Sequence, residues 1–397
     1  MTCSKTTVRS GKDMVTLEKL QEYQDEMLRC NRCGYCQAAC PIYDVLRREP
    51  ATARGRIRLL RAVSEGTLPL SESISQRIYD CTDCQSCRVS CPGGVRTSDI
   101  FAAARQLIAE SEFFPAALAE LEERVRTTHN ISGEPEENRL LWAENLEVRP
   151  EGLVEKKSAE VVLFTGCVSA LYPMAYGNLQ ALVEILQAAR VDFTTLGPEE
   201  WCCGYPLLSA GLPVSDLIAH NLDQVRALGA KTLLTTCPSC YHMWTHNYPS
   251  DSIQVLHSTE FLAELVEAGR LPVRPLNMRV TYHDPCDLGR KSEVYDAPRR
   301  IIKAIPGLEF VEMEDIRENA MCCGGGGNLE TLDAQLSQAV AKARLEQSQA
   351  VGAEVIVSAC QQCERTLAMA ARREKVRIRV MDVVQLLRMA LSREEEP

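Results

Sequence analysis

The cysteines constrain the fold of this chain more than any other feature of its sequence. There are 19 of them in 397 residues, and all except Cys3 fall into four clusters. The start of the chain lacks the apolar core of a secretory signal, and disulfide frameworks form in oxidising compartments. We therefore expect reduced thiols that bind metal in a cytoplasmic protein, and a free thiol at Cys3.

The rest of the composition excludes two classes of partner. The formal net charge is −10 and no basic stripe occurs, so nucleic acid has little electrostatic support as a ligand. The best candidate for a membrane span, residues 113–121, is far shorter than a bilayer requires and is followed by charged residues. We expect no transmembrane helix, and contact with a membrane only through a partner.

One cysteine motif occurs twice near the start of the chain. Four cysteines with gaps of two, two and three residues are followed by proline, and the second copy lies 51 residues after the first. The first copy contains Cys30, Cys33, Cys36 and Cys40, and the second contains Cys81, Cys84, Cys87 and Cys91. Apolar residues around both copies have helical spacing, which indicates helices joined by short metal-binding loops.

This spacing is typical of two-cluster bacterial ferredoxins, in which the fourth cysteine of each motif serves the other cluster. Structural zinc prefers two separated pairs of cysteines and suits a tight triple poorly. We therefore predict two cubane [4Fe–4S] clusters. The predicted ligand sets are Cys30, Cys33, Cys36 and Cys91 for the first, and Cys81, Cys84, Cys87 and Cys40 for the second.

The second half of the chain has a different pattern. Short β-prone runs alternate with stretches of helical spacing, which favours parallel sheets in α/β domains. The β-prone runs are residues 161–164, 231–236, 279–282 and 354–357, and predicted helices include 294–305 and 329–350. We predict a helical domain over 1–111, a linker over 112–157, and two α/β domains over 158–275 and 276–397.

Both α/β segments contain cysteines in the same order: a single cysteine, a Cys-Cys-Gly sequence and a Cys-x-x-Cys sequence. Corresponding positions are offset by 119 to 123 residues, which indicates a duplicated domain with small loop insertions. The single cysteines and the Cys-x-x-Cys sequences follow β-prone runs, at the edge where α/β sheets bind ligands. The first set is Cys167, Cys202, Cys203, Cys237 and Cys240, and the second is Cys286, Cys322, Cys323, Cys360 and Cys363.

Adjacent cysteines cannot easily reach one ion, because neighbouring side chains diverge, but they can bind two irons of an extended cluster. The glycines that follow, Gly204 and residues 324–327, allow backbone N–H groups to approach cluster sulfur or a substrate. A phosphate-binding loop is the alternative for 324–327, and the absence of a following lysine disfavours it. We therefore predict an extended metal cluster in each α/β domain.

In these motifs the chain resembles the D-type subunit of heterodisulfide reductase, over residues 17–387. The motif separations are similar to those of the cysteine-rich CCG domain. The resemblance implies an α+β multidomain fold, with an N-terminal α-helical two-cluster ferredoxin domain followed by two duplicated α/β CCG domains. It also implies a noncubane [4Fe–4S] cluster on each set of five cysteines, with disulfide cleavage between the two clusters.

The same architecture occurs in electron-transfer subunits of glycolate oxidase, anaerobic glycerol-3-phosphate dehydrogenase and lactate-utilisation proteins. Some of those subunits lack cysteines in one motif, whereas this chain retains all ten, which favours disulfide or thiol chemistry. Residues 53–57, however, also resemble the glycolate oxidase iron–sulfur subunit. The resemblance therefore leaves the substrate open.

Three histidines lie near predicted ligands. Disulfide reduction consumes protons, so His283, three residues before Cys286, is a candidate proton donor at the cluster edge. Ligation of the cluster and a structural hydrogen bond are its alternatives. His242 and His246 follow Cys240 and have the same alternatives.

Four basic residues could act on charge near the clusters. Arg54 and Arg56 could offset cluster charge or receive an anionic partner, although exposed charged residues are usually only solvated. Arg290 and Lys291, close after Cys286, could attract a carboxylate or phosphate on a substrate.

We predict an iron–sulfur oxidoreductase subunit that passes electrons through two cubane clusters to the noncubane pair, where a small disulfide is reduced or formed. The alternative is a relay between a flavin dehydrogenase or electron-transfer flavoprotein and membrane quinone or a cytochrome. A third class is a scaffold or sensor without turnover. No Gly-x-Gly-x-x-Gly sequence follows a strand, so the chain needs a redox partner such as a cytochrome b or one of those flavoproteins. Such a partner could hold it at the inner face of the cell membrane.

Overall fold

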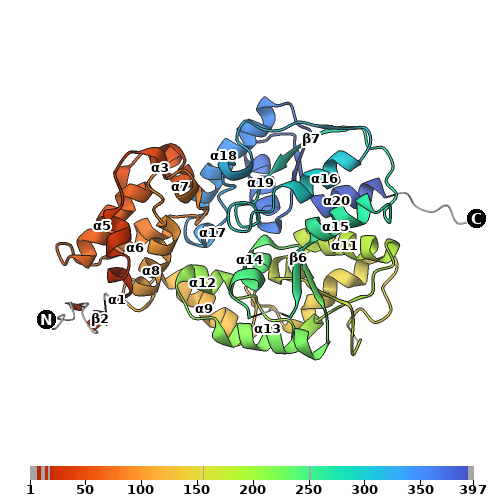
Figure 1. The fold of residues 1–397 in the computed structure, drawn as a ribbon, viewed down its shortest axis with the longest axis horizontal. Helices are drawn as coiled ribbons and strands as arrows, with labels where there is room; N and C mark the ends of the chain where they lie inside the picture. Colours follow the sequence, from red (N-terminus) through yellow and green to blue (C-terminus); the bar gives the residue numbers. More distant parts are fainter. Residues whose placement is uncertain (1–6, 10–13, 17, 155, 250–251, 392–397) are drawn as a thin grey trace, which may run out of the picture. The chain divides into compact units, whose positions relative to one another are not determined.

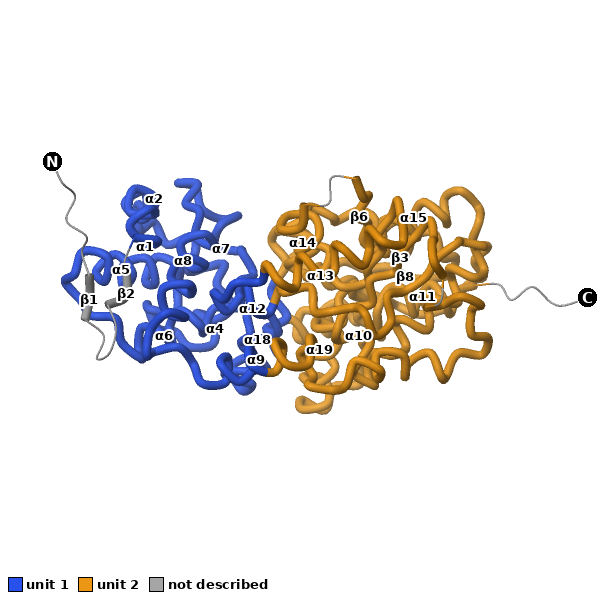
Figure 2. Tube along the Cα trace, turned by 90° about the horizontal axis from the view of Figure 1, so that it is seen from below, with its two compact units in different colours: residues 1–123, 206–214, 321–343 blue, residues 124–205, 215–320, 344–397 orange. Residues whose placement is uncertain are grey.

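The computed structural model describes residues 7–9, 14–16, 18–154, 156–249 and 252–391. Cys3, predicted to be a free thiol, lies outside the described residues. The chain divides into two compact units, coloured separately in Figure 2. Unit 1 contains residues 1–123, 206–214 and 321–343, and unit 2 contains residues 124–205, 215–320 and 344–397.

Unit 1 consists mainly of short helices, as the sequence predicts (Figure 1). Two short antiparallel strands, β1 (Thr7–Arg9) and β2 (Met14–Thr16), precede them. The helices of the ferredoxin-like segment are α1 (Glu18–Gln21), α2 (Gln24–Leu28), α3 (Tyr35–Ala38), α4 (Pro41–Leu46), η1 (Glu49–Ala51), α5 (Ala53–Ser64), α6 (Glu72–Tyr79), α7 (Ser86–Val89) and α8 (Thr97–Ala109). Four further helices lie mainly in this unit: α9 (Ala116–Thr128), α12 (Tyr205–Ala210), α17 (Leu329–Leu332) and α18 (Ala334–Ala350).

Side-chain caps fix where the longer helices of unit 1 begin. The Thr52 hydroxyl accepts a hydrogen bond from the Gly55 N–H at 3.0 Å at the start of α5, and Ser71 caps α6 in the same way. Apolar residues of α5, such as Leu60 and Val63, are fully buried. This anchors the helix that borders both ferredoxin-type loops.

Unit 2 contains two parallel sheets of four strands with the same topology. The sheet orders are β4-β3-β5-β6 in the first repeat and β8-β7-β9-β10 in the second. The central strands β3 and β5 of the first sheet therefore correspond to β7 and β9 of the second. The strands are β3 (Val161–Phe164), β4 (Phe193–Thr195), β5 (Thr232–Thr235), β6 (Gln254–His257), β7 (Met278–His283), β8 (Leu308–Phe310), β9 (Val355–Ser358) and β10 (Arg379–Asp382). This shared strand order supports the predicted duplication.

Helices cover the sheets of unit 2, and one hydrophobic core includes residues from both repeats. None of the helices in the described part of the chain has the length and apolar composition needed to cross a membrane. The helices are η2 (Glu136–Asn145), α10 (Cys167–Leu171), η3 (Pro173–Ala175), α11 (Tyr176–Ala188), η4 (Gly197–Glu199), α13 (Ser215–Ala227), α14 (Pro238–His246), α15 (Ser258–Glu267), α16 (Asp296–Ala304), η5 (Arg317–Asn319), α19 (Gln361–Arg373) and α20 (Val383–Ala390).

Two predicted segments contain local structure that the sequence pattern did not indicate. The single helix predicted over 329–350 is interrupted at Asp333, whose carboxylate accepts a hydrogen bond from the Leu336 N–H at 2.9 Å and starts α18. The predicted linker, 112–157, contains α9 and η2, and Trp142 in η2 is fully buried in the core of unit 2. The predicted domain boundaries themselves stay a prediction.

Candidate metal-cluster sites

The eighteen cysteines among the described residues are all free thiols. Cys33 is exposed, and the others are buried or partly buried. Free thiols that gather in sets of four and five, away from bulk water, are the donors that iron–sulfur clusters require. Such donors occur in both units of this chain.

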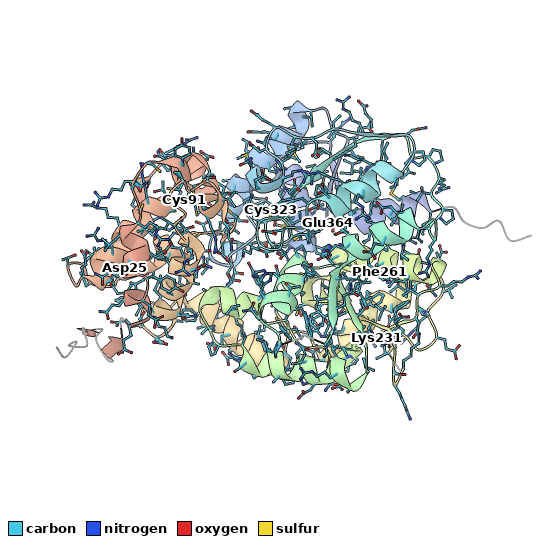
Figure 3. All side chains as sticks on the ribbon, viewed as in Figure 1. Asp25, Cys91, Lys231, Phe261, Cys323 and Glu364 are labelled. Carbon is cyan, nitrogen blue, oxygen red and sulfur yellow. The ribbon has the colours of Figure 1, made fainter. Side chains whose placement is uncertain are left out.

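The first predicted quartet surrounds one cavity of unit 1. Cys30, Cys33, Cys36 and Cys91 all line it, together with Cys87 from the second loop; Cys91 is labelled in Figure 3. The cavity is therefore lined by three thiols from the first motif and by two from the second, including its fourth cysteine. This is the arrangement that the ferredoxin spacing predicts.

The two ferredoxin-type loops have matching backbone conformations. Arg32 and Gly34 in the first loop have φ of 59° and 96°, and Asp83 and Gln85, 51 residues later, have φ of 53° and 62°. Left-handed conformations are uncommon for residues other than glycine. Their recurrence at equivalent positions indicates that both loops wrap a cluster of the same shape.

The second predicted quartet lies around a buried arginine. Cys40, Cys81 and Cys87 all interact electrostatically with the guanidinium of Arg56, which also donates to the Arg77 carbonyl at 2.7 Å. Burial raises the pKa of the Cys40 thiol to about 11, and Cys84 lies close enough to add to that shift. Since iron binds thiolates, loading this site must release protons, and Arg56 offsets part of the negative charge.

The glycine loop, residues 324–327, packs against the second ferredoxin-type loop inside unit 1. A Cβ on Gly326 would lie 2.7 Å from the Thr82 carbonyl oxygen, and one on Gly327 would meet the Cys81 carbonyl. The N–H groups of Gly324 and Gly325 instead donate to the sulfurs of Cys322 and Cys323, at 3.3 and 3.4 Å. The loop thus serves two purposes: sulfur contact at its start and close backbone packing at its end.

The five cysteines of the first α/β repeat form a continuous series of thiols in unit 2, and all except the partly buried Cys237 are buried. Hydrogen-bonding contacts join Cys167 to Cys202, Cys202 to Cys203, Cys203 to Cys240, and Cys240 to Cys237. The hydrogen bonds from Cys202 and Cys240 lower the pKa of the Cys203 thiol to about 6. The five cysteines of the first predicted set are therefore joined in a series of neighbouring thiols, and their role as ligands of one cluster stays a prediction.

A buried ion pair holds the walls of this thiol chain. Arg139 donates to Glu200 at 3.1 Å and to the Cys167 sulfur at 3.6 Å, and both charged side chains are at most 1% exposed. Glu200 also accepts the N–H groups of Thr165 and Gly166, at 2.6 and 2.7 Å. The Glu200 carboxylate therefore connects the segment before Cys167 to the segment before Cys202. Arg139 places a positive charge beside the Cys167 sulfur.

The second repeat is divided between the two units. Cys286, Cys360 and Cys363 lie in unit 2, whereas Cys322 and Cys323 belong to the segment 321–343 of unit 1. In the second sheet His283 pairs with Ser358 in parallel register, just as Phe164 pairs with Thr235 in the first. Because Cys286 and Cys360 follow these strand ends at the same intervals as Cys167 and Cys237, they lie at the equivalent sheet edge.

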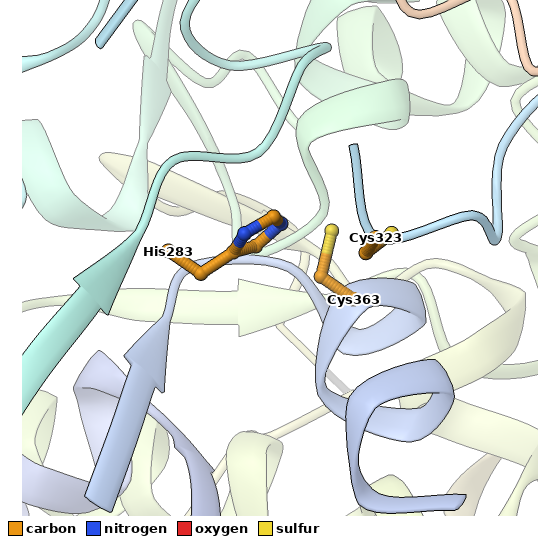
Figure 4. Close-up of side chains that lie close together, drawn as sticks. All are labelled: His283, Cys323 and Cys363. Atoms are coloured by element: carbon orange, nitrogen blue, oxygen red, sulfur yellow. The ribbon is translucent and has the colours of Figure 1, made fainter. Parts of the chain in front are cut away.

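His283, at the end of β7, points toward Cys363 in α19 (Figure 4). A ring nitrogen of His283 and the Cys363 sulfur lie within 4.8 Å of each other. Arg344 donates from Nε to His283 Nδ1 at 3.1 Å, and burial lowers the pKa of Arg344 only to about 10. Because Nδ1 accepts this bond, the neutral ring carries its proton on Nε2.

A polar cluster joins the cysteine segments of the two repeats inside unit 2. Asp287, next to Cys286, accepts hydrogen bonds from Ser239 at 2.6 Å and Tyr205 at 3.2 Å. Lys291, whose side chain is 2% exposed, lies 3.0 Å from Asp287 and 2.7 Å from the Tyr205 oxygen. Burial raises the pKa of Asp287, but Lys291 and Ser239 outweigh it, so the pKa lies below its usual value.

The other predicted basic residues and histidines have local partners. Arg54 bonds to Glu49 and Gln37, and Arg290 donates to the Ala320 carbonyl at 2.6 Å. His242 lies edge-on to Tyr205, and His246 contacts the Thr245 hydroxyl. His242 also acts electrostatically on Asp287 of the polar cluster and lowers its pKa.

Several residues that shape the sites were not predicted from the sequence. Arg139, Glu200, Tyr205 and Asp287 belong to no motif, and their contacts join segments far apart in the chain. Glu364, labelled in Figure 3, accepts a hydrogen bond from Asn178 of the other repeat at 2.7 Å, and burial raises its pKa to about 7. The position of Glu364 directly after Cys363, and of Asp287 directly after Cys286, was the only signal available.

Comparison with known families supports the predicted cofactors. Residues 26–95 match a 4Fe–4S dicluster domain, and residues 161–245 and 280–368 each match the cysteine-rich domain called CCG. The donor sets described above fit both kinds of cluster. The protein therefore contains two cubane [4Fe–4S] clusters and cysteine-rich sites of the noncubane type.

Two curated relatives and one solved structure match more than nine tenths of this chain. The D-type subunit of dihydromethanophenazine:CoB–CoM heterodisulfide reductase from Methanosarcina mazei is 32% identical, over 93% of this chain and 95% of its own length. The EtfAB:quinone oxidoreductase of Syntrophomonas wolfei is 29% identical, over 91% of this chain and 58% of its own length. A crystal structure of a hypothetical protein from Helicobacter pylori shares the fold, with a TM-score of 0.56 and 11% identity over 95% of this chain and 77% of that one. The chain is thus an iron–sulfur oxidoreductase subunit that belongs to the family of D-type subunits of heterodisulfide reductase.

Proposed function

We propose that this subunit reduces, or in the reverse direction forms, a small disulfide at the cysteine-rich sites of its two repeats. The reaction takes two electrons and two protons and converts one disulfide into two thiols. When bound, the clusters supply the one-electron transfers that bring those electrons to the disulfide. The substrate class is a heterodisulfide such as that of coenzymes M and B, which the name of the M. mazei relative contains.

One observation carries the proposal: the hydrogen bond between Ser239 and Asp287 at 2.6 Å. Ser239 lies between Cys237 and Cys240, and Asp287 follows Cys286, so the bond brings the ligand segments of the two repeats together within unit 2. A disulfide needs two neighbouring sites, one for each sulfur. All ten cysteines of the two sets are present, and we propose them as the ligands, with the ferredoxin-type quartets as the ligands of the cubanes.

The residues around this junction suggest how protons and charge are handled. We propose His283 as a proton donor, because its ring lies beside Cys363 and carries its neutral-state proton on Nε2. Lys291 and the partly buried Asp287 form an ion pair that can orient a polar substrate without leaving a net charge at the junction. Arg139 stabilises negative charge on Cys167.

The test is an anaerobic assay with the coenzyme M–coenzyme B heterodisulfide and reduced viologen as the electron donor. We expect two thiols for every two electrons consumed. Cys240→Ala, which breaks the thiol chain, should abolish the reaction, whereas Cys3→Ala, outside the predicted sets, should leave it unchanged. Wild-type protein with full clusters that consumes no disulfide would contradict the proposal.

The second candidate function is a relay to membrane quinone. The observation that favours it is the similarity to the EtfAB:quinone oxidoreductase over 91% of this chain. In that case the electrons would come from an electron-transfer flavoprotein or a flavin dehydrogenase, and the chain would act at the inner face of the membrane through a partner such as a cytochrome b. Quinone reduction by the purified complex without any disulfide turnover would favour this function.

A further inference from the structure

A groove rich in arginine lies beside the first ferredoxin-type quartet in unit 1. Cys30 forms part of its wall, and a single carboxylate, Glu65, lines it. Four arginines line the same groove, and we call it the arginine groove: Arg32, Arg54, Arg58 and Arg61. This concentration of positive charge is unusual in a chain whose formal net charge is −10.

Helix α5 places most of this charge on one face. Arg54, Arg58 and Arg61 are four and three residues apart, a spacing that puts them in line along a helix. Arg54 pairs with Glu49 and Arg61 with Glu65, each at 2.6 Å. Arg58 and Arg32 are exposed, and neither makes an ion pair with any residue that the structure describes.

The duplicated loop provides an internal comparison. Arg29 and Arg32 of the first loop correspond, at the constant offset of 51, to Asp80 and Asp83 of the second. Cys33 is exposed, whereas its counterpart Cys84 is buried. The two loops share their backbone conformation, but only the first has an exposed second cysteine and arginines at these two positions.

Tyr35 lines the neighbouring cluster cavity together with Arg32 and Arg54, and Leu28 follows Met27, which lines the arginine groove. Tyr35, in the first loop, is 63% exposed, and Leu28, at the end of α2, is 51% exposed. Both belong to the few large apolar side chains that the described surface exposes to this extent. An aromatic centre with a charged rim is typical of protein interfaces, and the rim charge selects the partner.

We propose that the arginine groove, with Tyr35 and Leu28, is the docking surface for an acidic electron-transfer protein. The partner loses one electron, which enters the cluster held by the first quartet, and no covalent bond forms or breaks. The negative charge of the rest of the chain repels an acidic partner, so the groove favours one orientation of docking. The proposal rests on the redox role proposed above but not on the identity of the substrate.

The experiment compares two charge-reversal variants of the whole cluster-loaded protein. The test variant is Arg32→Glu with Arg58→Glu, and the matched control is Arg372→Glu with Arg373→Glu, two exposed arginines of α19 in unit 2. Arg54 is left intact because it also donates to Gln37 and the Arg32 carbonyl. The probe is an acidic bacterial ferredoxin with two [4Fe–4S] clusters, and the readouts are its binding to the immobilised protein and the rate at which it reduces the protein in stopped flow.

We expect the association rate of wild-type protein to fall by about tenfold or more as salt rises, because steering by exposed charge is screened. The test variant should lose a similar factor at low salt, and the control should lose none. Reduction by the cationic methyl viologen radical should not slow in the test variant, which shows that its clusters still accept electrons. If viologen reduction is lost, Arg58→Gln replaces the double variant in the same comparison.

Equal association rates for the wild-type protein and the test variant at low salt would overturn the proposal. A decrease of the association rate in the control variant as large as that in the test variant would also overturn it. The result of this docking experiment does not depend on whether the protein reduces a disulfide. A protein that reduces no disulfide but still binds the ferredoxin through the arginine groove would refute disulfide chemistry and retain the docking surface. Disulfide turnover together with a ferredoxin reaction that does not depend on salt would support disulfide chemistry and refute the docking surface.

Discussion

At the scale of single residues, the pair formed by Arg139 and Glu200 explains how a charged group can lie beside a ligand thiol. Arg139 is 1% exposed and Glu200 is fully buried, so neither charge is solvated. Glu200 receives two backbone N–H groups besides Arg139. The loss of Arg139 would leave the Glu200 carboxylate buried with these hydrogen bonds but without the opposite charge of the arginine.

Arg139→Gln should destabilise the protein by about 3 to 5 kcal/mol, the cost that follows from leaving one member of a buried ion pair unpaired. The measurement is the shift of the urea unfolding midpoint, with Arg372→Gln as an exposed control. A shift in Arg139→Gln as small as that in the control would show that the pair does not hold the site.

A second residue makes stability depend on pH. His257 ends β6, its Nε2 lies 3.1 Å from the Thr236 carbonyl, and burial lowers its pKa to about 4. In the unfolded chain the pKa returns to about 6.5, so the unfolded state binds the proton first as pH falls. The stability contributed by neutral His257 is therefore complete above pH 6.5 and is lost as pH falls toward 4.

The free energy of unfolding should decrease by about 1.4 kcal/mol per pH unit between pH 6.5 and pH 4, and by about 3 kcal/mol in total. His257→Asn keeps a side chain that can cap α15 but cannot titrate, so it should flatten this slope. Denaturant unfolding of both proteins at several pH values tests the expectation. The same slope in the variant would assign the pH dependence to other groups.

The residues that could be predicted are those that belong to a pattern. The cysteine spacing predicted ligand sets, and one cavity is lined by all four cysteines of the first quartet together with Cys87, while the assignment of ligands to clusters stays a prediction. Arg139 and Glu200 could not be predicted, because they lie 61 residues apart and neither forms part of a repeat. A contact between such residues exists only once the fold has brought them together.

At the scale of elements, the strands that were predicted and those that were missed differ in position. The four β-prone runs correspond to β3, β5, β7 and β9, the central strands of the two sheets. The missed strands, β4, β6, β8 and β10, are all edge strands of three or four residues. Central strands of parallel sheets are buried on both faces and read as continuous apolar runs, whereas a strand such as β8 is only partly buried.

The glycine loop allows a matched test of close packing. Gly327 and Gly229 both have φ of 62°, but a Cβ on Gly327 would meet backbone atoms of Cys81 and Thr82, while none lies near Gly229. Gly327→Ala should destabilise the protein by about 1 to 3 kcal/mol more than Gly229→Ala, because the latter carries only the backbone strain.

Thermal unfolding of the two glycine variants gives the comparison, and the paramagnetic signal of the second cubane gives an independent readout. A broadened or shifted signal in Gly327→Ala alone would agree with contact between this loop and the cluster loop. Equal stability of the two variants would contradict the close approach.

At the scale of the whole molecule, the duplication could be predicted and the division into units could not. The constant motif order predicted two repeats, and the sheets have the same strand order. Two later segments belong to unit 1 with the ferredoxin-like residues. The segment 206–214 comes shortly after the first Cys-Cys-Gly motif, and the segment 321–343 contains the second. Tertiary packing determines that the segment 321–343 belongs to unit 1: Leu336 and Val340 share a hydrophobic cluster with Cys40 and Ile42. No local sequence pattern indicates this packing.

The central claim is that the two cysteine-rich sites act directly on sulfur substrates. The most direct measurement is electron paramagnetic resonance of the oxidised, anaerobically purified protein before and after addition of coenzyme M or coenzyme B. We expect a new paramagnetic signal in wild-type protein that is absent from Cys240→Ala, with the reduced-state cubane signals intact in both proteins. Silence with either thiol, in protein that contains about sixteen iron and sixteen acid-labile sulfide per chain, would contradict it.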